Sequence, residues 1–209
     1  MSGRRLWIAV LCVIVLAGLL RAQEKNELSG GIGRTFLGTQ GIQGVTVFDP
    51  NIRYGAGIDI EGNYARRFLV TPIFSVAAEV PLVFNVDEDV HASSAGLGPG
   101  DLKELFVTPS ARLNLFPTTA VSPWGSLGGG FAHISEASTL LFGGTNPGKG
   151  TTSGVLQYGV GLDVKLTQHV LVRAEARDFW AGEPDFPEAP TGKTRQHNYF
   201  LGVSVAWRF

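Results

Sequence analysis

YFLGVSVAWRF, residues 199–209, ends the chain with a strict two-residue alternation. One set of alternate residues is apolar or aromatic throughout, and it consists of Tyr199, Leu201, Val203, Val205, Trp207 and Phe209. The intervening residues are mostly small or polar, and the last of them is Arg208. This period predicts a β-strand with one apolar face and one different face. Chain ends of water-soluble proteins usually fray in solvent, so an aromatic carboxyl terminus on the apolar face indicates contact with lipid.

This terminal stretch resembles the closing strand of bacterial outer-membrane β-barrels, which typically ends in Phe after alternating apolar residues. The resemblance is to small eight-stranded barrels of the OmpA type, and it implies an outer-membrane location and a monomer in contact with outer-membrane lipid. It also implies that Tyr199, Trp207 and Phe209 form an assembly signal for the barrel assembly machinery. It implies no particular activity, because this architecture hosts anchors, adhesins, small channels and lipid enzymes alike.

The amino terminus has the layout of a secretory signal peptide. Arg4 and Arg5 precede an apolar run over residues 6–20, and the small residue Ala22 follows it. The run of about fifteen residues is shorter than the roughly twenty that a transmembrane helix needs. We therefore expect a cleaved signal peptide at residues 1–22 and an outer-membrane β-barrel domain at residues 23–209, with an uncleaved anchor helix as the alternative.

Composition argues against several functional classes. The formal net charge is −1, which gives no reason to expect nucleic acid as a partner. Cys12 is the only cysteine and lies in the amino-terminal apolar run, so the exported chain would have no disulfide and no thiol chemistry. The four histidines are scattered without the spacing of a metal site, and we expect no metal and no cofactor.

The rest of the chain divides into eight patterned segments separated by breaks rich in glycine and proline. The segments cover residues 27–37, 52–64, 70–84, 105–116, 121–134, 154–166, 170–177 and 199–209. The breaks at 66–69, 117–120 and 167–169 are short, whereas those at 38–51, 85–104, 135–153 and 180–196 are long. Alternating short turns and long loops are typical of outer-membrane barrels, whose short turns are periplasmic. We predict an all-β fold: an eight-stranded antiparallel up-and-down transmembrane β-barrel.

A soluble β-sandwich is the main structural alternative, because its strands also alternate in polarity. A sandwich gives no reason for short and long breaks to alternate. In hydrocarbon, by contrast, an open sheet edge would leave backbone groups without hydrogen-bond partners, so the sheet must close. Eight strands enclose an interior that side chains can fill.

The faces opposite the apolar ones carry charges, which we expect to point into the lumen. The acids are Asp59, Glu61, Glu79, Asp163 and Glu175, and the bases are Arg53, Arg112, Lys165, Arg173, Arg177 and Arg208. Buried charges persist only when they are paired and hydrogen-bonded. We therefore predict a crossed ion-pair network that plugs the lumen, with inward glycines making room for the arginines. The expected role is structural or surface interaction through long extracellular loops, without enzymatic activity.

Two alternative functions stay open. The first is a narrow channel for small or apolar solutes. The second is a lipid A-modifying enzyme that uses His133 and Ser135, which lie on the predicted outer face where the fifth segment leaves the membrane. This pair resembles the His-x-Ser of lipid A deacylase barrels, in which a base activates the serine. The chain departs from that family, because Glu136 follows where Asn is usual and the expected acid is missing from the start of the sixth segment.

Aromatic residues near the predicted strand ends are interpreted as interfacial girdles, where amphipathic rings meet the lipid headgroups. They are Tyr64, Phe68, Phe116, Trp124, Phe179, Trp180, Tyr199, Trp207 and Phe209.

Overall fold

The computed structural model describes residues 25–37, 40–41, 51–54, 57–92, 101–139, 145–146, 150–182 and 195–209. Its strands are β1 (Asn26–Leu37), β2 (Gln40–Gly41), β3 (Asn51–Tyr54), β4 (Ile58–Val70), β5 (Phe74–Ala92), β6 (Asp101–Val107), β7 (Ser110–Leu115), β8 (Val121–Thr139), β9 (Thr145–Asn146), β10 (Gly150–Lys165), β11 (Val170–Gly182) and β12 (Arg195–Arg208). Within these ranges no helix is long and apolar enough to span a membrane. The predicted signal peptide lies outside the described residues.

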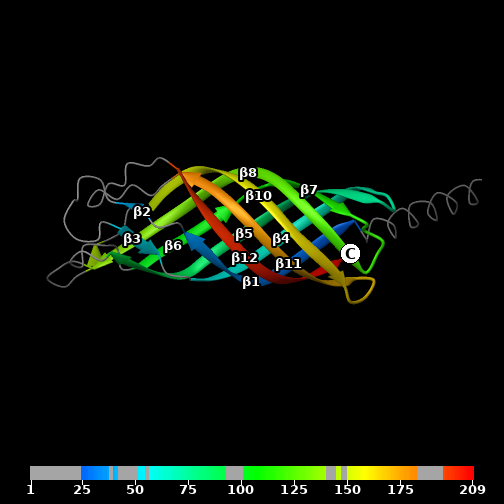
Figure 1. Ribbon diagram of the computed structural model, residues 1–209, viewed down its shortest axis with the longest axis horizontal. Helices are drawn as coiled ribbons and strands as arrows, with labels where there is room; N and C mark the ends of the chain where they lie inside the picture. Colours follow the sequence, from blue (N-terminus) through cyan, green and yellow to red (C-terminus); the bar gives the residue numbers. More distant parts are fainter. Residues whose placement is uncertain are drawn as a thin grey trace, which may run out of the picture.

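The strands form a closed antiparallel barrel with eight strand positions, as the sequence predicts. Two of these positions are each made of two consecutive strands, β3 with β4 and β6 with β7, and both pairs border β5. Strand β12 closes the sheet on β1, in a register that runs from Glu27 opposite Arg208 to Leu37 opposite Asn198. Figure 1 shows the strands crossing the long axis obliquely, with the carboxyl terminus at the end opposite β2 and β3. The carboxyl terminus shares its end with the short turns after β4, β7 and β10.

Side chains alternate between the lumen and the outer surface along each strand. In β12 the apolar set of the terminal stretch is exposed, whereas Phe200, Ser204, Ala206 and Arg208 are buried. The backbone keeps the last residue in register, because Phe209 N donates to Asn26 O and Asn26 N donates to Phe209 O, both at 2.9 Å. The predicted facing of the closing strand is therefore confirmed.

The strand ends differ from the predicted breaks. The predicted turn at residues 66–69 is wrong, because β4 continues to Val70 and pairs there with Ser75. A register shift between Arg67 and Leu69 breaks the two-residue period at this point, which is why the pattern suggested a turn. At the other end of the barrel, β5 continues to Ala92 and β6 begins at Asp101, so both strands extend into the predicted break at 85–104.

The fourth predicted strand is interrupted at Thr108 and Pro109, which separate β6 from β7. Proline has no backbone N–H to donate, so a regular ladder cannot continue through it. The sheet stays connected because Thr108 N donates to Pro81 O at 3.3 Å and Gly129 N donates to Pro109 O at 3.1 Å.

Candidate functional site

The lumen contains a network of buried ion pairs with Glu27 at its centre. Glu27, at the start of β1, accepts hydrogen bonds from Arg112 Nη2 and Arg173 Nη2, both at 2.6 Å. Its second oxygen accepts a hydrogen bond from Arg208 Nε at 2.9 Å. Asp163 of β10 accepts from Arg173 Nε at 2.7 Å and lies 3.5 Å from Arg208 Nη2. Arg173 and Arg208 therefore each contact two carboxylates across the barrel.

A second group of pairs surrounds Arg177 of β11. Its Nη1 lies 2.9 Å from Glu79, its Nε lies 2.7 Å from Glu175, and its Nη2 lies 3.9 Å from Glu61. Glu79 also lies 3.1 Å from Arg112 Nη1, which joins this group to the pairs around Glu27. We call the whole set the lumen ion-pair network; its members are Glu27, Glu61, Glu79, Arg112, Asp163, Arg173, Glu175, Arg177 and Arg208.

Trp124 of β8 lies inside this network. The guanidinium carbons of Arg112, Arg173 and Arg177 lie 5.8, 5.4 and 5.2 Å from its ring centroid, within the range of cation–π attraction. Trp124 is only 4% exposed, so its interpretation as a girdle residue is wrong. The glycines around Trp124 hide the sequence pattern that would show which side chains of β8 point into the lumen. The pairing of β8 with β10 in the structure settles this.

A second layer in the lumen is apolar. It consists of Val83, Phe106, Ala132, Val155, Phe179, Ala181 and Phe200, and all of these are buried. The Phe106 and Phe179 rings stack with centroids 4.5 Å apart. Phe179 follows Arg173 and Arg177 along β11 toward the Gly182 end, so this layer lies on the long-loop side of the network. The girdle interpretation is therefore wrong for Phe179 as well.

Other predicted site residues lie apart from the ion-pair network. Asp59 is buried on β4 and accepts a hydrogen bond from Thr35 Oγ1 at 2.7 Å. Lys165 is half-buried at the short-turn rim, where its Nζ donates to the carbonyl of Pro117. Arg53 lies in β3, but its side chain is outside the described part of the chain.

Sequence reasoning missed Glu27 and Glu104, both of which are buried in the lumen. The signal for Glu27 was present, because Leu28 and Ile32 are apolar and alternate with it, which places Glu27 on the inner face. The sequence pattern places Glu104 in the long break at 85–104, because nothing in it indicates that β6 begins at Asp101.

Glycines in the wall accommodate large lumen side chains. A Cβ at Gly161 would lie 2.5 Å from the Trp124 ring, and one at Gly202 would lie 2.5 Å from the Phe200 ring. At Gly159 the nearest Arg177 atom would be 3.4 Å away. The inward glycines therefore make room for aromatic rings more than for the arginines that we expected.

His133 and Ser135 lie in the half of β8 that is nearer the long-loop end of the barrel. His133 is exposed and Ser135 is half-buried. The Nδ1 atom of His133 lies 2.9 Å from the hydroxyl of Thr152, its register partner on β10. Among the described residues no carboxylate contacts His133, and no three acids, histidines or cysteines gather as a metal site. A serine nucleophile needs a base that a third group orients. The group beside the ring of His133 is the hydroxyl of Thr152, which takes the place of the orienting carboxylate.

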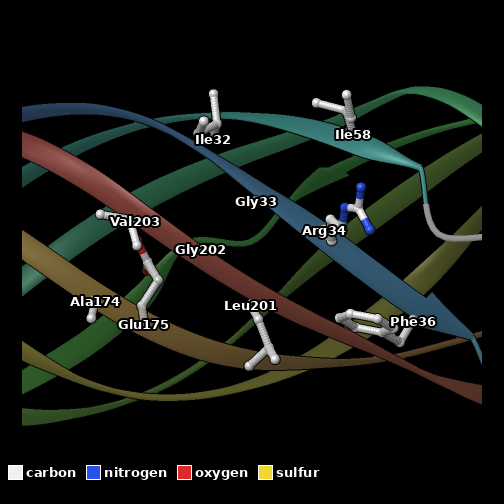
Figure 2. Close-up of a pocket in the computed structure, with 10 residues that line it drawn as sticks. All are labelled: Ile32, Gly33, Arg34, Phe36, Ile58, Ala174, Glu175, Leu201, Gly202 and Val203. Atoms are coloured by element: carbon white, nitrogen blue, oxygen red, sulfur yellow. The ribbon is translucent and has the colours of Figure 1, made fainter.

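A groove of about 570 Å³ lies on the outer wall between β1 and β12. Figure 2 shows Ile32, Phe36, Leu201 and Val203 projecting around Gly33 and Gly202, with Arg34 on the same face. The groove therefore combines mostly apolar walls with one outward basic side chain, and Glu175 of β11 also lines it.

The geometry of a closed barrel with an apolar exterior agrees with the comparison to known families. The model of the outer membrane protein beta-barrel domain matches residues 8–209. The chain belongs to this family. Its outer-membrane location, which the terminal strand predicted, is confirmed with it.

Two solved outer-membrane proteins are among the structures to which the chain is similar. Neisserial surface protein A is 14% identical, and the match covers 88% of this chain and 97% of that chain with a TM-score of 0.54. OprG from Pseudomonas aeruginosa is also 14% identical, with 90% of this chain and 98% of that chain covered and a TM-score of 0.49. No curated protein matches the chain. At 14% identity the likeness to Neisserial surface protein A concerns the fold of the barrel alone.

Proposed function

We propose that this outer-membrane barrel is a non-conducting, non-enzymatic protein with a structural or surface-interaction role. The observation that carries the proposal is the filling of the lumen by two successive layers. Three arginines surround Trp124 in the first layer, and stacked Phe106 and Phe179 belong to the second. An interior of this width is filled by side chains rather than by a water column.

The ion-pair network supports a plug because its members hold one another in place. Arg173 and Arg177 are each 2% exposed or less, and each contacts at least two carboxylates. A buried guanidinium that left its partners would lose several charge-assisted hydrogen bonds at once. Opening a path for ions would therefore require several pairs to separate together.

The outer surface supports contact with outer-membrane lipid and a monomeric barrel. Large apolar side chains are exposed around the wall, including Leu28, Ile32, Ile60, Leu82, Leu113, Leu127, Val160, Leu162, Leu201, Val203 and Val205. The aromatic residues Tyr64, Phe68, Phe116, Tyr199, Trp207 and Phe209 are exposed as well, in agreement with girdles. Outer-membrane lipid would cover this apolar band, so a monomeric barrel needs no partner protein to bury it.

Surface interaction is assigned to the end opposite the carboxyl terminus. The turns at the terminal end are short, since Leu166 and Thr167 donate backbone hydrogen bonds to Val170. At the other end the strands are joined by longer segments, such as residues 183–194 between β11 and β12. Binding residues lie disproportionately on loops that a rigid scaffold holds in place. We place the end with the long segments outside the cell.

Planar-bilayer recording tests this proposal. The refolded wild-type barrel is expected to give no conductance steps. A porin recorded in the same bilayers is the positive control, because it shows that the assay detects an open lumen. Reproducible steps from the wild type would refute the plug in favour of the narrow channel.

Mass spectrometry of lipid A tests the enzymatic alternative. Membranes that contain the wild type and membranes that contain His133→Ala should carry identical lipid A. A modification present only with the wild type would assign catalysis to His133 and Ser135.

A further inference from the structure

Beyond the apolar layer, the lumen contains two buried carboxylates on either side of an asparagine. In the strand register Asp59 of β4 lies opposite Asn85 of β5, and Asn85 lies opposite Glu104 of β6. All three side chains are 0% exposed. Glu104 precedes Phe106 in β6 and lies nearer the long segment that leads into this strand. The row therefore lies on the long-loop side of the stacked rings. Three oxygen-bearing side chains therefore occupy neighbouring inward positions near the mouth of the barrel.

These two carboxylates lack the counter-charges that the ion-pair network provides. Neither oxygen of Glu104 accepts a hydrogen bond, and Oδ1 of Asp59 accepts none either. Asp59 Oδ2 accepts a hydrogen bond from the neutral hydroxyl of Thr35 at 2.7 Å. Among the described residues no basic group forms an ion pair with Asp59 or Glu104. An unpaired buried carboxylate is neutralised either by a proton or by a bound cation.

We propose that Asp59 and Glu104 bind a divalent metal ion, with Ca²⁺ as the ion that fits best. Two carboxylates carry the charge that a divalent cation neutralises. Their ligand atoms are hard oxygens, which favour Ca²⁺ or Mg²⁺ over transition metals. Ca²⁺ accepts irregular coordination and completes its shell with water, whereas Mg²⁺ demands near-octahedral geometry. A site built from side chains on β4 and β6, two strand positions apart, suits the more tolerant ion.

Calcium in this position would join β4 and β6 across β5 at the mouth of the barrel. The site is separate from the ion-pair network, and its occupancy does not depend on whether the lumen conducts. Failure of the bilayer experiment and failure of the calcium experiment are therefore distinguishable.

Isothermal titration calorimetry on the refolded barrel in non-ionic detergent, stripped with a chelator, tests the site with Ca²⁺ as the probe. One Ca²⁺ per barrel should bind to the wild type and raise its thermal unfolding midpoint. Glu104→Gln and Asp59→Asn preserve side-chain size and should each weaken binding by more than about tenfold, since even the loss of a supporting partner of a metal ligand costs roughly 10–100-fold. In chelator both variants should unfold at or above the wild-type midpoint, because each removes an unpaired buried charge.

The matched control is Asp178→Asn. Asp178 is a strand carboxylate in contact with His197 at 2.8 Å, and this change should leave calcium binding unaltered. A wild-type barrel that binds no Ca²⁺, or binding that survives in both lumen variants, would overturn the proposal. A midpoint that responds to acidification and not to Ca²⁺ would overturn it too, since protonation would then neutralise the carboxylates.

Discussion

Replacing Glu27 by glutamine removes the carboxylate at the centre of the lumen ion-pair network. Glu27 is 1% exposed and accepts three charge-assisted hydrogen bonds from Arg112, Arg173 and Arg208. Glutamine offers one carbonyl oxygen, and its amide hydrogens would face guanidinium donors. Removing one partner of a buried ion pair costs about 3–5 kcal/mol.

The surviving contacts place the expected loss at the lower end of that range. Arg173 and Arg208 keep Asp163, at 2.7 and 3.5 Å, and Arg112 keeps Glu79 at 3.1 Å. We therefore expect Glu27→Gln to lower the free energy of unfolding by about 3 kcal/mol. With a urea slope of about 2 kcal/mol per molar, the unfolding midpoint should fall by about 1.5 M.

Urea titration of the refolded barrel in detergent or lipid, followed by tryptophan fluorescence and by migration on an unheated gel, measures this shift. The matched control is Leu28→Ala, because Leu28 is the next residue in β1 and is 57% exposed on the outer wall. The control should lose about 1–2 kcal/mol, because Leu28 passes from lipid to water on unfolding and each CH₂ removed is worth roughly 0.8 kcal/mol. If Glu27→Gln unfolds within about 0.5 kcal/mol of the wild type, the network does not stabilise the barrel and the argument for a rigid plug is refuted.

Three further changes test other parts of the structure. Trp124→Leu should lower the free energy of unfolding by about 3 kcal/mol in the same titration, because it removes a buried ring that three guanidinium groups contact. Trp124→Phe keeps an aromatic ring and should lose less than half of that free energy. Equal losses for the two variants would contradict the cation–π contribution. Gly161→Ala should destabilise by about 1–3 kcal/mol, because its Cβ would overlap the Trp124 ring, whereas Gly62→Ala has open space and should cost little; similar midpoints for the two would show that the wall adapts. Phe209→Ala keeps the backbone bonds to Asn26 and should reduce the amount of barrel in the outer membrane of cells more than the refolding yield in vitro; equal losses would mean that Phe209 is only a lipid contact.

The facing of most strands could be predicted from the sequence because a β-strand alternates its side chains with a period of two. Where apolar residues recur at every second position, as in residues 199–209, the pattern alone separates Val203 from Ser204. A one-residue slip would turn the whole strand over, so each well-patterned strand has one acceptable orientation in lipid. The same rule explains the errors, since the glycines around Trp124 carry no pattern and the register shift at the end of β4 interrupts one.

The partners of each inward side chain, by contrast, depend on how the strands are staggered around the closed barrel. Glu27 meets Arg112 and Arg208 from positions 85 and 181 residues away in the chain, and periodicity within one strand says nothing about such meetings. The sequence by itself determined that charges face inward and apolar groups face the lipid, because that choice is local to each strand. Only the tertiary structure decided that Glu27 is enclosed by arginines while Glu104 contacts no arginine of the described strands, because those neighbours are set by the register of strands far apart in the chain.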